Sequence, residues 1–106
     1  MPSMQRPLYQ MKAEFFKTLG HPVRIRVLEL LSVRAHAVSE LLEEIDVEAA
    51  NLSQQLSILR RAGLVRACRT GLSVTYELTS PKVAELLAVA RAILTGVVAD
   101  QVEALG

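Results

Sequence analysis

The segment NLSQQLSILRRAGLVRACRTG, residues 51–71, changes its hydrophobic period part-way along, from that of a helix to that of a strand. Its first half predicts a helix from about residue 47 or 48 to Ala62, because three leucines recur on one side at helical spacing: Leu52, Leu56 and Leu59. Gly63 suits the C-terminal cap. Beyond it, residues 64–70 and 72–78 are alternating or β-branched segments, which predicts a β-hairpin with its tip near residues 70–73.

Helical periodicity continues on both sides of this segment. A first amphipathic helix is expected over residues 8–19, and a second opens at Pro22 and runs to about Ser32. After the connector VRAHAV, Ser39 is a plausible N-cap for a short third helix that ends near Asp46. Pro81 opens a last helix that extends to about residue 104.

The resulting order is α-α-α-α-β-β-α, which predicts a mainly α fold with a β-hairpin wing, the winged helix-turn-helix. Residues 39–62 form the expected helix-turn-helix and residues 64–78 the wing. A length of 106 residues argues for one domain over residues 1–106. A single cysteine, the absence of an apolar run long enough to cross a bilayer and a start without signal-peptide character favour a reduced, cytoplasmic protein with no membrane partner.

The net charge of +1 conceals a segregated pattern. Residues 1–48 carry six bases and seven acids (net −1), residues 49–76 carry four arginines and no acid (net +4), and residues 77–106 carry two bases and four acids (net −2). Segregation of this kind indicates a region that meets an anion, although a solvated face without a partner shows the same pattern.

The outer face of the helix over residues 51–61 consists of small, amide and arginine side chains, with no Glu or Lys. Asn and Gln bond adenine in two places, Ser bonds several bases and Ala packs on a thymine methyl, whereas arginines bind phosphates. The candidate DNA contacts are therefore Ala50, Asn51, Ser53, Gln54 and Ser57 toward bases, and Arg60, Arg61, Arg66 and Arg69 toward phosphates. The alternative is an ordinary surface helix that is poor in charge.

Three stretches, FFKTLGHPVRIRVLELL, VSELLEEIDVEAANLSQQLSILRRAGLV and TYELT, resemble the ArsR/SmtB family of bacterial winged-helix repressors over roughly residues 12–95. The run from Leu52 to Val65 is the most specific part. The resemblance implies a homodimer on a pseudo-palindromic operator, released from DNA by an effector that is often a metal ion. The contact positions that it implies are Ala49, Ala50, Asn51, Ser53, Gln54 and Ser57, with a wing tip of Arg69, Thr70, Gly71, Leu72 and Ser73.

Two features depart from the family pattern. Glu48 stands where these proteins usually have Ser or Thr at the start of the recognition helix, and Glu is a poor N-cap although its charge suits the helix dipole. Asp46 is an alternative cap that would start the helix earlier. The wing RTGLS is less basic than usual, so we expect modest nonspecific affinity and a shallow salt dependence.

Metal ligands are sparse in this sequence. The positions of a Cys-x-Cys pair found in many relatives are Ala37 and Ser39, and the last helix has no histidine. His21 suits a structural or capping role, which leaves His36 as a weak metal candidate. Cys68 is expected to be a small buried residue, with redox sensing left open. No cofactor is required by these residues, and sensing would use an unseen site or a partner protein, or regulation would act through expression level alone.

Both terminal helices have more apolar surface than one small domain covers. We expect them to pair with a second copy, which also places two recognition helices about 34 Å apart on DNA. The candidate dimer residues are Leu8, Phe15, Leu87, Leu94, Val97 and Val98. The alternative is that these stripes belong to the core of one chain.

No Ser–His–acid set, phosphate-binding glycine loop or metal-ligand cluster is present in the sequence, so an enzyme is not expected. The competing hypothesis is a winged helix that serves as a protein-interaction module without DNA specificity. Interface cores favour aromatic residues and Met, which the outer face of residues 51–61 lacks.

Overall fold

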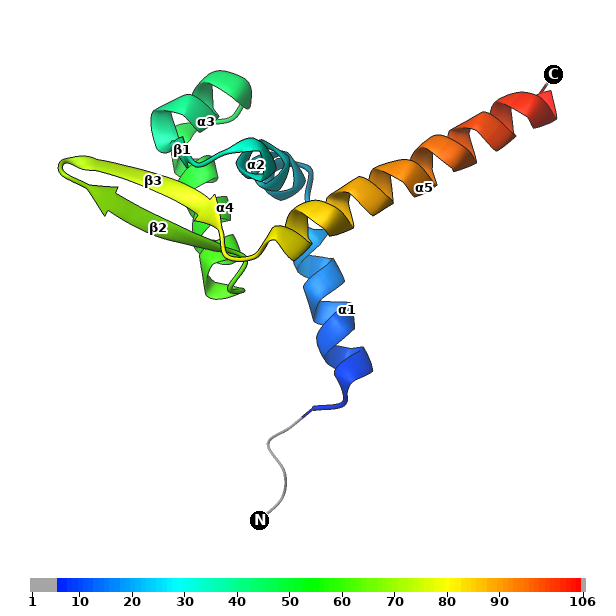
Figure 1. Ribbon diagram of the computed structural model, residues 1–106, viewed down its shortest axis with the longest axis horizontal. Helices are drawn as coiled ribbons and strands as arrows, with labels where there is room; N and C mark the ends of the chain where they lie inside the picture. Colours follow the sequence, from blue (N-terminus) through cyan, green and yellow to red (C-terminus); the bar gives the residue numbers. More distant parts are fainter. Residues whose placement is uncertain (1–5, 106) are drawn as a thin grey trace, which may run out of the picture.

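The structure is a computed structural model that describes residues 6–105, and over that range the predicted order of helices and hairpin is confirmed (Figure 1). The elements are α1 (Leu8–Leu19), α2 (Pro22–Val33), β1 (His36–Ala37), α3 (Val38–Glu44), α4 (Ala49–Arg61), β2 (Val65–Thr70), β3 (Ser73–Leu78) and α5 (Pro81–Leu105). Helices α3 and α4 form the helix-turn-helix, and β2 with β3 form the wing of a winged helix-turn-helix.

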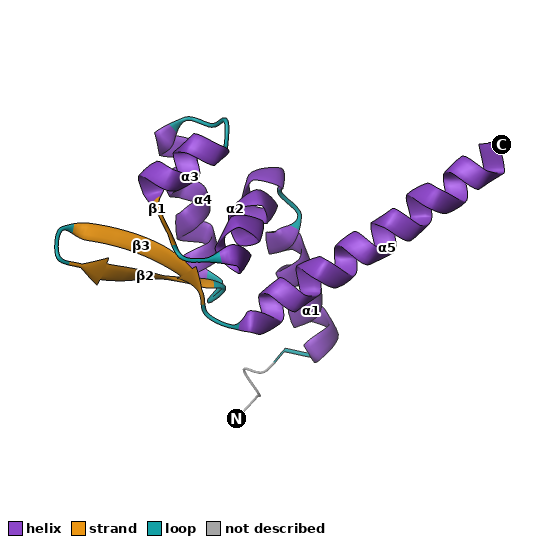
Figure 2. Cartoon of the chain, turned by 45° about the horizontal axis from the view of Figure 1, so that its top comes forward, coloured by secondary structure: helices purple, strands orange, loops and turns teal. Residues whose placement is uncertain are grey.

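The core is a cluster of aliphatic side chains to which α2, α3, α4 and the start of β2 contribute. Its fully buried members are Val27, Leu28, Leu41, Leu52, Leu56, Leu59 and Val65. Because burying a leucine side chain stabilises the fold by about 1.5–3 kcal/mol, the three leucines of α4 determine which side of that helix faces solvent. Figure 2 shows α2, α3 and α4 gathered beside the hairpin.

The starts of two helices are fixed by side-chain hydrogen bonds. His21 is the N-cap of α2, where its Nδ1 accepts from the Val23 amide at 3.1 Å, so its expected capping role is confirmed. The prediction that Ser39 caps α3 was wrong, because the helix begins at Val38 with Ala37 as N-cap. The Ala37 amide donates to the Glu40 carboxylate at 2.9 Å, which is the glutamate half of a capping box and satisfies the amide of the N-cap residue.

The connector before α3 contains a strand that sequence periodicity did not predict. His36 pairs with Tyr76 and Ala37 with Thr75, so β1 joins the hairpin as an antiparallel third strand in the order β1-β3-β2. Two residues are too few to show an alternating pattern, so this strand depends on its partner β3.

The wing is a hairpin whose last pair joins Thr70 to Ser73 across a two-residue turn. Gly71 in that turn has φ of 63°, which glycine adopts without the cost that a side chain brings. The predicted tip is thus confirmed.

Helices α1 and α5 extend away from the cluster formed by the other elements (Figure 1). The radius of gyration is 16.6 Å, whereas a compact domain of this length has about 13 Å. The chain therefore leaves much of its two terminal helices in solvent.

Candidate nucleic-acid interface

The base-contacting surface predicted on α4 lies on the exposed side of that helix. Leu52, Leu56 and Leu59 hold the opposite side in the core. The predicted contact residues of α4 are all exposed: Ala49, Ala50, Asn51, Ser53, Gln54, Ser57, Arg60 and Arg61. The structure thus presents them together on one side of α4, as the periodicity predicted.

Ser57, Arg60 and Arg61 line a shallow hollow of about 690 Å³ at the C-terminal end of α4. Neither arginine has a carboxylate within ion-pair distance among residues 6–105. Two uncompensated guanidinium groups beside a hydroxyl form a site suited to a phosphate oxygen.

The tip of the wing carries three of the predicted contacts. Arg69, Thr70 and Ser73 are exposed, and Arg69 is likewise without a carboxylate partner in the described part of the chain. Leu72 between them is 100% exposed. The tip therefore offers one cation, two hydroxyls and one apolar side chain.

Arg66, in contrast, is paired with a carboxylate, and its expected phosphate contact stays a prediction. Its Nε donates to Glu77 on the neighbouring strand at 2.9 Å, and the two residues are a cross-strand pair. The sequence prediction missed this pairing because Glu77 lies just outside the acid-free segment. The wing consequently has a smaller positive charge than its arginine count suggests.

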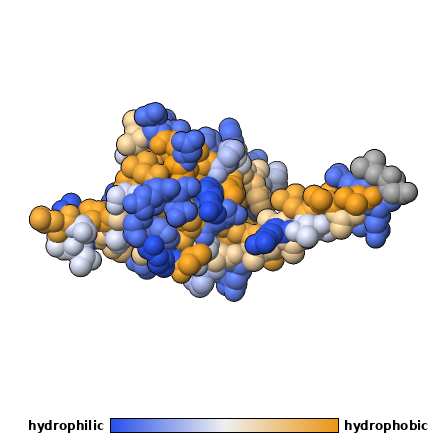
Figure 3. All heavy atoms as spheres, turned by 90° about the horizontal axis from the view of Figure 1, so that it is seen from above, coloured by the Kyte–Doolittle hydropathy of each residue, from blue (hydrophilic) through white to orange (hydrophobic). Residues whose placement is uncertain are grey.

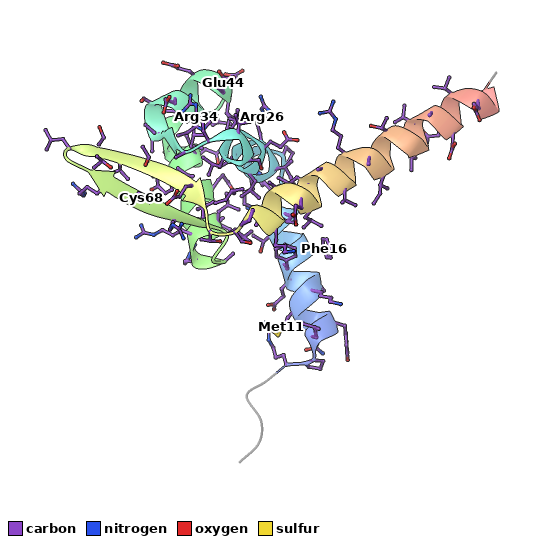
Figure 4. All side chains as sticks on the ribbon, viewed as in Figure 1. Met11, Phe16, Arg26, Arg34, Glu44 and Cys68 are labelled. Atoms are coloured by element: carbon purple, nitrogen blue, oxygen red, sulfur yellow. The ribbon has the colours of Figure 1, made fainter. Side chains whose placement is uncertain are left out.

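Cys68 shares the Glu77 carboxylate, since its thiol donates to Oε1 at 2.9 Å (Figure 4 labels the cysteine on the wing). The hydrogen bond to the carboxylate, together with desolvation and the nearby negative charge, raises the pKa of Cys68. The same thiol, followed by Arg66, lowers the pKa of Glu77. Cys68 is half-buried and not fully buried as expected.

Asn51 takes part in a hydrogen-bonded chain that the sequence did not reveal. Its Oδ1 accepts from Gln55 Nε2 at 2.9 Å, and Gln55 Oε1 accepts from Arg24 at 2.8 Å. Gln55 is only 6% exposed. The sequence indicates this hydrogen-bonded chain only by placing a polar residue, Gln55, next to Leu56 on the apolar side of the predicted helix.

Glu48 is the N-cap residue of α4, with no side-chain hydrogen bond to the helix. The alternative that Asp46 caps an earlier start was wrong, because α4 begins at Ala49 and the Glu48 carbonyl accepts from the Leu52 amide at 3.0 Å. The exposed carboxylate of Glu48 thus lies at the start of the contact surface, where the positive end of the helix dipole favours it.

Comparison with known proteins places this geometry in a family. Residues 19–67 match a family model described as a helix-turn-helix domain. The uncharacterised HTH-type transcriptional regulator Rv0081 of Mycobacterium tuberculosis is 56% identical over 100 residues, which cover 93% of this chain and 88% of the relative. Its crystal structure superposes with a TM-score of 0.85 over 92% of this chain and 99% of the other. The chain belongs to the ArsR family of helix-turn-helix transcriptional regulators.

Two further structures resemble this ArsR-family regulator. The transcriptional repressor BigR from Xylella fastidiosa is 34% identical, with a TM-score of 0.72 over 83% of this chain and 87% of the other. The homodimeric winged helix-turn-helix DNA-binding domain of Mb0332 from Mycobacterium bovis is 26% identical, with a TM-score of 0.75 over 88% and 90% of the two chains.

The predicted dimer residues of the ArsR-family regulator differ in exposure. Leu8, Leu94, Val97 and Val98 are exposed, whereas Phe15 and Leu87 are half-buried and pack partly on the chain's own core. Figure 4 labels Met11 and Phe16, two further exposed apolar residues of α1. Apolar side chains gather along α5 (orange in Figure 3).

A groove of about 540 Å³ runs between α2 and α5. Its lining is mainly aliphatic, with one acid and one base: Ile25, Glu29, Leu87, Ala90, Arg91, Leu94, Thr95 and Val98. The groove is continuous with the exposed apolar face of α5, since Leu94 and Val98 belong to both.

His36 is buried in the small sheet, and its Nδ1 lies 2.8 Å from the Arg34 carbonyl oxygen. No group of three or more His, Cys, Asp or Glu residues converges within residues 6–105. Within this part of the ArsR-family regulator, His36 therefore does not belong to a cluster of three or more potential metal ligands. None of the helices described is both long and apolar enough to span a bilayer.

Proposed function

We propose that this chain is a homodimeric repressor that binds a pseudo-palindromic DNA site through α4 and the wing. The observation that carries the proposal is one exposed face: the acid-free side of α4, which continues into Arg60 and Arg61 and is followed by a wing that ends in Arg69. Small and amide side chains suit base edges, and the three arginines, which have no carboxylate partner among residues 6–105, suit phosphates. A cytoplasmic location follows from this partner.

The two-fold partner is supported by the terminal helices. Exposed apolar side chains of α1 and α5 would be covered if each copy placed these helices against those of the other. A dimer would also set two α4 helices about one turn of DNA apart, roughly 34 Å. The related Mb0332 domain is described as homodimeric, and BigR as a repressor.

Control of DNA binding would come from an effector or from a partner protein that senses it. The described residues supply no converging ligands for a transition metal, so His36 remains a weak candidate. Calorimetric titration of the metal-free protein with Zn²⁺, Ni²⁺ or Co²⁺ tests this: stoichiometric micromolar binding with loss of DNA affinity would establish a metal effector.

The direct test is selection of bound duplexes from a random pool, followed by titration of the selected duplex with salt. We expect a two-fold symmetric site that is bound more tightly than random DNA. If the protein does not bind the selected duplex more tightly than random DNA at low ionic strength, the proposed function is wrong. The hypothesis of a protein-interaction module is then favoured.

Two variants separate base contact from phosphate contact. Gln54→Ala should reduce the preference for the selected duplex by about tenfold, because it removes one amide contact to a base edge. Arg69→Ala should weaken every duplex alike and reduce the salt slope by about 1. Arg26→Ala is the matched control, since Arg26 is an exposed arginine of α2 paired with Glu29, and its loss should leave both quantities unchanged.

A further inference from the structure

A chain of hydrogen bonds runs from the end of α1 to the exposed face of α4. Arg24 on α2 donates its Nε to the Thr18 carbonyl at 2.6 Å and a second N–H to Gln55 Oε1 at 2.8 Å. Gln55 donates its Nε2 to Asn51 Oδ1 at 2.9 Å, one helical turn earlier on the same helix. Asn51 is exposed at the other end of this chain, on the predicted base-contacting surface.

The guanidinium group of Arg24 fixes the orientation of the side-chain amides of Gln55 and Asn51. A guanidinium has donors and no acceptor, so Gln55 must turn its carbonyl oxygen toward Arg24. Its NH₂ group then faces Asn51, which must accept the hydrogen bond through its own side-chain oxygen. A side-chain amide rotated the other way would set like groups against each other at both contacts. The two amides therefore share one orientation, dictated from α2.

This arrangement is specific because Gln55 is almost fully buried, at a helix position next to Leu56 of the core. An amide without partners in such surroundings costs free energy, and an apolar residue would fill the same space without that cost. Both ends of the Gln55 amide are satisfied, one by α2 and one by Asn51.

We infer that Gln55 is a positioning residue for DNA recognition: it binds the oxygen of Asn51 and leaves the two Nδ2 hydrogens of Asn51 for the DNA. The inference rests on the proposed function. It makes Asn51 a hydrogen-bond donor, which suits the acceptors in the major groove, namely purine N7, guanine O6 and thymine O4. Because Asn51 Oδ1 has a second lone pair, the sequence-based expectation that Asn51 bonds adenine in two places stays a prediction, now with one fixed orientation of the amide.

The sharpest test is Gln55→Glu. The introduced carboxylate is isosteric and still pairs with Arg24, but it has no hydrogen to offer Asn51. The Asn51 amide should rotate so that its Nδ2 donates to the carboxylate and its oxygen faces the DNA. At the base pair under Asn51, preference should then move by roughly tenfold from acceptor-bearing edges to the amino group of cytosine. Preference at the other base pairs should not change.

Gln55→Met is the second variant, in case the buried carboxylate prevents folding. It removes the amide while filling the space, so Asn51 is free to rotate. The preference at that one base pair should become weak without inverting. Each variant is compared with wild type by selection from the random pool and by thermal unfolding, because base preference, unlike affinity, is unaffected by a uniform loss of stability or charge.

Asn51→Ala assigns the base pair. It should abolish the preference at one position, and adding Gln55→Glu to it should change that preference no further, since coupling requires both side chains. If Asn51→Ala leaves every base preference intact, or if folded Gln55→Glu and Gln55→Met proteins select the wild-type sequence, this inference is overturned while the proposed function stands. If wild type selects no sequence, the proposed function fails and the inference fails with it.

Discussion

Cys68 illustrates how one carboxylate sets the chemistry of a neighbouring residue. The hydrogen bond to Glu77 raises the pKa of the thiol, so the protonated form is stabilised by folding. The contribution of this hydrogen bond to stability is present below the pKa of an unfolded cysteine, about 8.5. It is lost as the pH rises through the pKa of Cys68 in the folded protein. The thiolate, which is the reactive form, is thus disfavoured at neutral pH.

We predict that alkylation of Cys68 by iodoacetamide follows a pH profile displaced above that of free cysteine. Glu77→Gln should displace the profile to lower pH, because it removes the charge that opposes the thiolate. Mass spectrometry reads the rate directly, since Cys68 is the only cysteine in the sequence. Glu85→Gln removes a carboxylate from α5 and should leave the profile unchanged. A wild-type profile at or below that of free cysteine would contradict the prediction.

For individual residues, the sequence predicted which side chains are exposed better than it predicted their hydrogen-bond partners. The helical spacing of Leu52, Leu56 and Leu59 was sufficient to orient α4, and so to find the exposed contact residues. The partner of Gln55 lies 31 positions away on α2, and the partner of Arg66 lies across the hairpin. Such contacts depend on tertiary packing, which helical periodicity does not contain.

Among the elements, the junction between α4 and the wing has the most specific geometry. Gly63 has φ of 78° and donates to the Arg60 carbonyl, while Leu64 donates to the Leu59 carbonyl, both at 3.0 Å. This pair of bonds is a Schellman motif, with the buried Leu64 and Leu59 as its apolar contact. The Gly63 carbonyl also accepts from the Thr79 hydroxyl at 2.6 Å, which joins the helix end to the end of β3.

Gly63→Ala should therefore destabilise the protein by about 1–2 kcal/mol, because a side chain is unfavourable in the left-handed conformation. Urea unfolding measures the change. Gly63→Asn should cost less, since Asn tolerates that conformation better. Equal stability of the alanine variant and wild type would show that the junction is not strained by a Cβ.

The sequence identified five helices and a hairpin because each is long enough to show a period, and Gly63 because glycine marks a helix end. It failed at the two-residue β1 and at the cap of α3. In the first case pairing with β3 determines the conformation, and in the second the helix starts before Ser39, with the Ala37 amide bonded to the Glu40 carboxylate.

For the whole molecule, the exposed helices α1 and α5 are the main departure from a compact domain. Leu94, which is 63% exposed on α5, also lines the groove against α2. Leu94→Glu should place a charge in the proposed interface and convert the dimer to a monomer in light scattering. Leu72→Glu makes the same change at the fully exposed wing tip, away from α5, and should leave the dimer intact.

A wild-type protein that is monomeric at micromolar concentration would refute the dimer itself. Loss of the dimer in both variants would show that the assembly is sensitive to charge in general and does not depend on the face of α5.

Because a single chain leaves both terminal helices exposed, its stability should depend on protein concentration. If two copies must meet before either long helix is covered, the folded pair is favoured by every increase in total protein, and the unfolding temperature should rise with concentration. Occupancy of a DNA site would then vary with roughly the square of the number of free chains when dimers are scarce. A modest change in synthesis would be amplified at the DNA before any effector is bound.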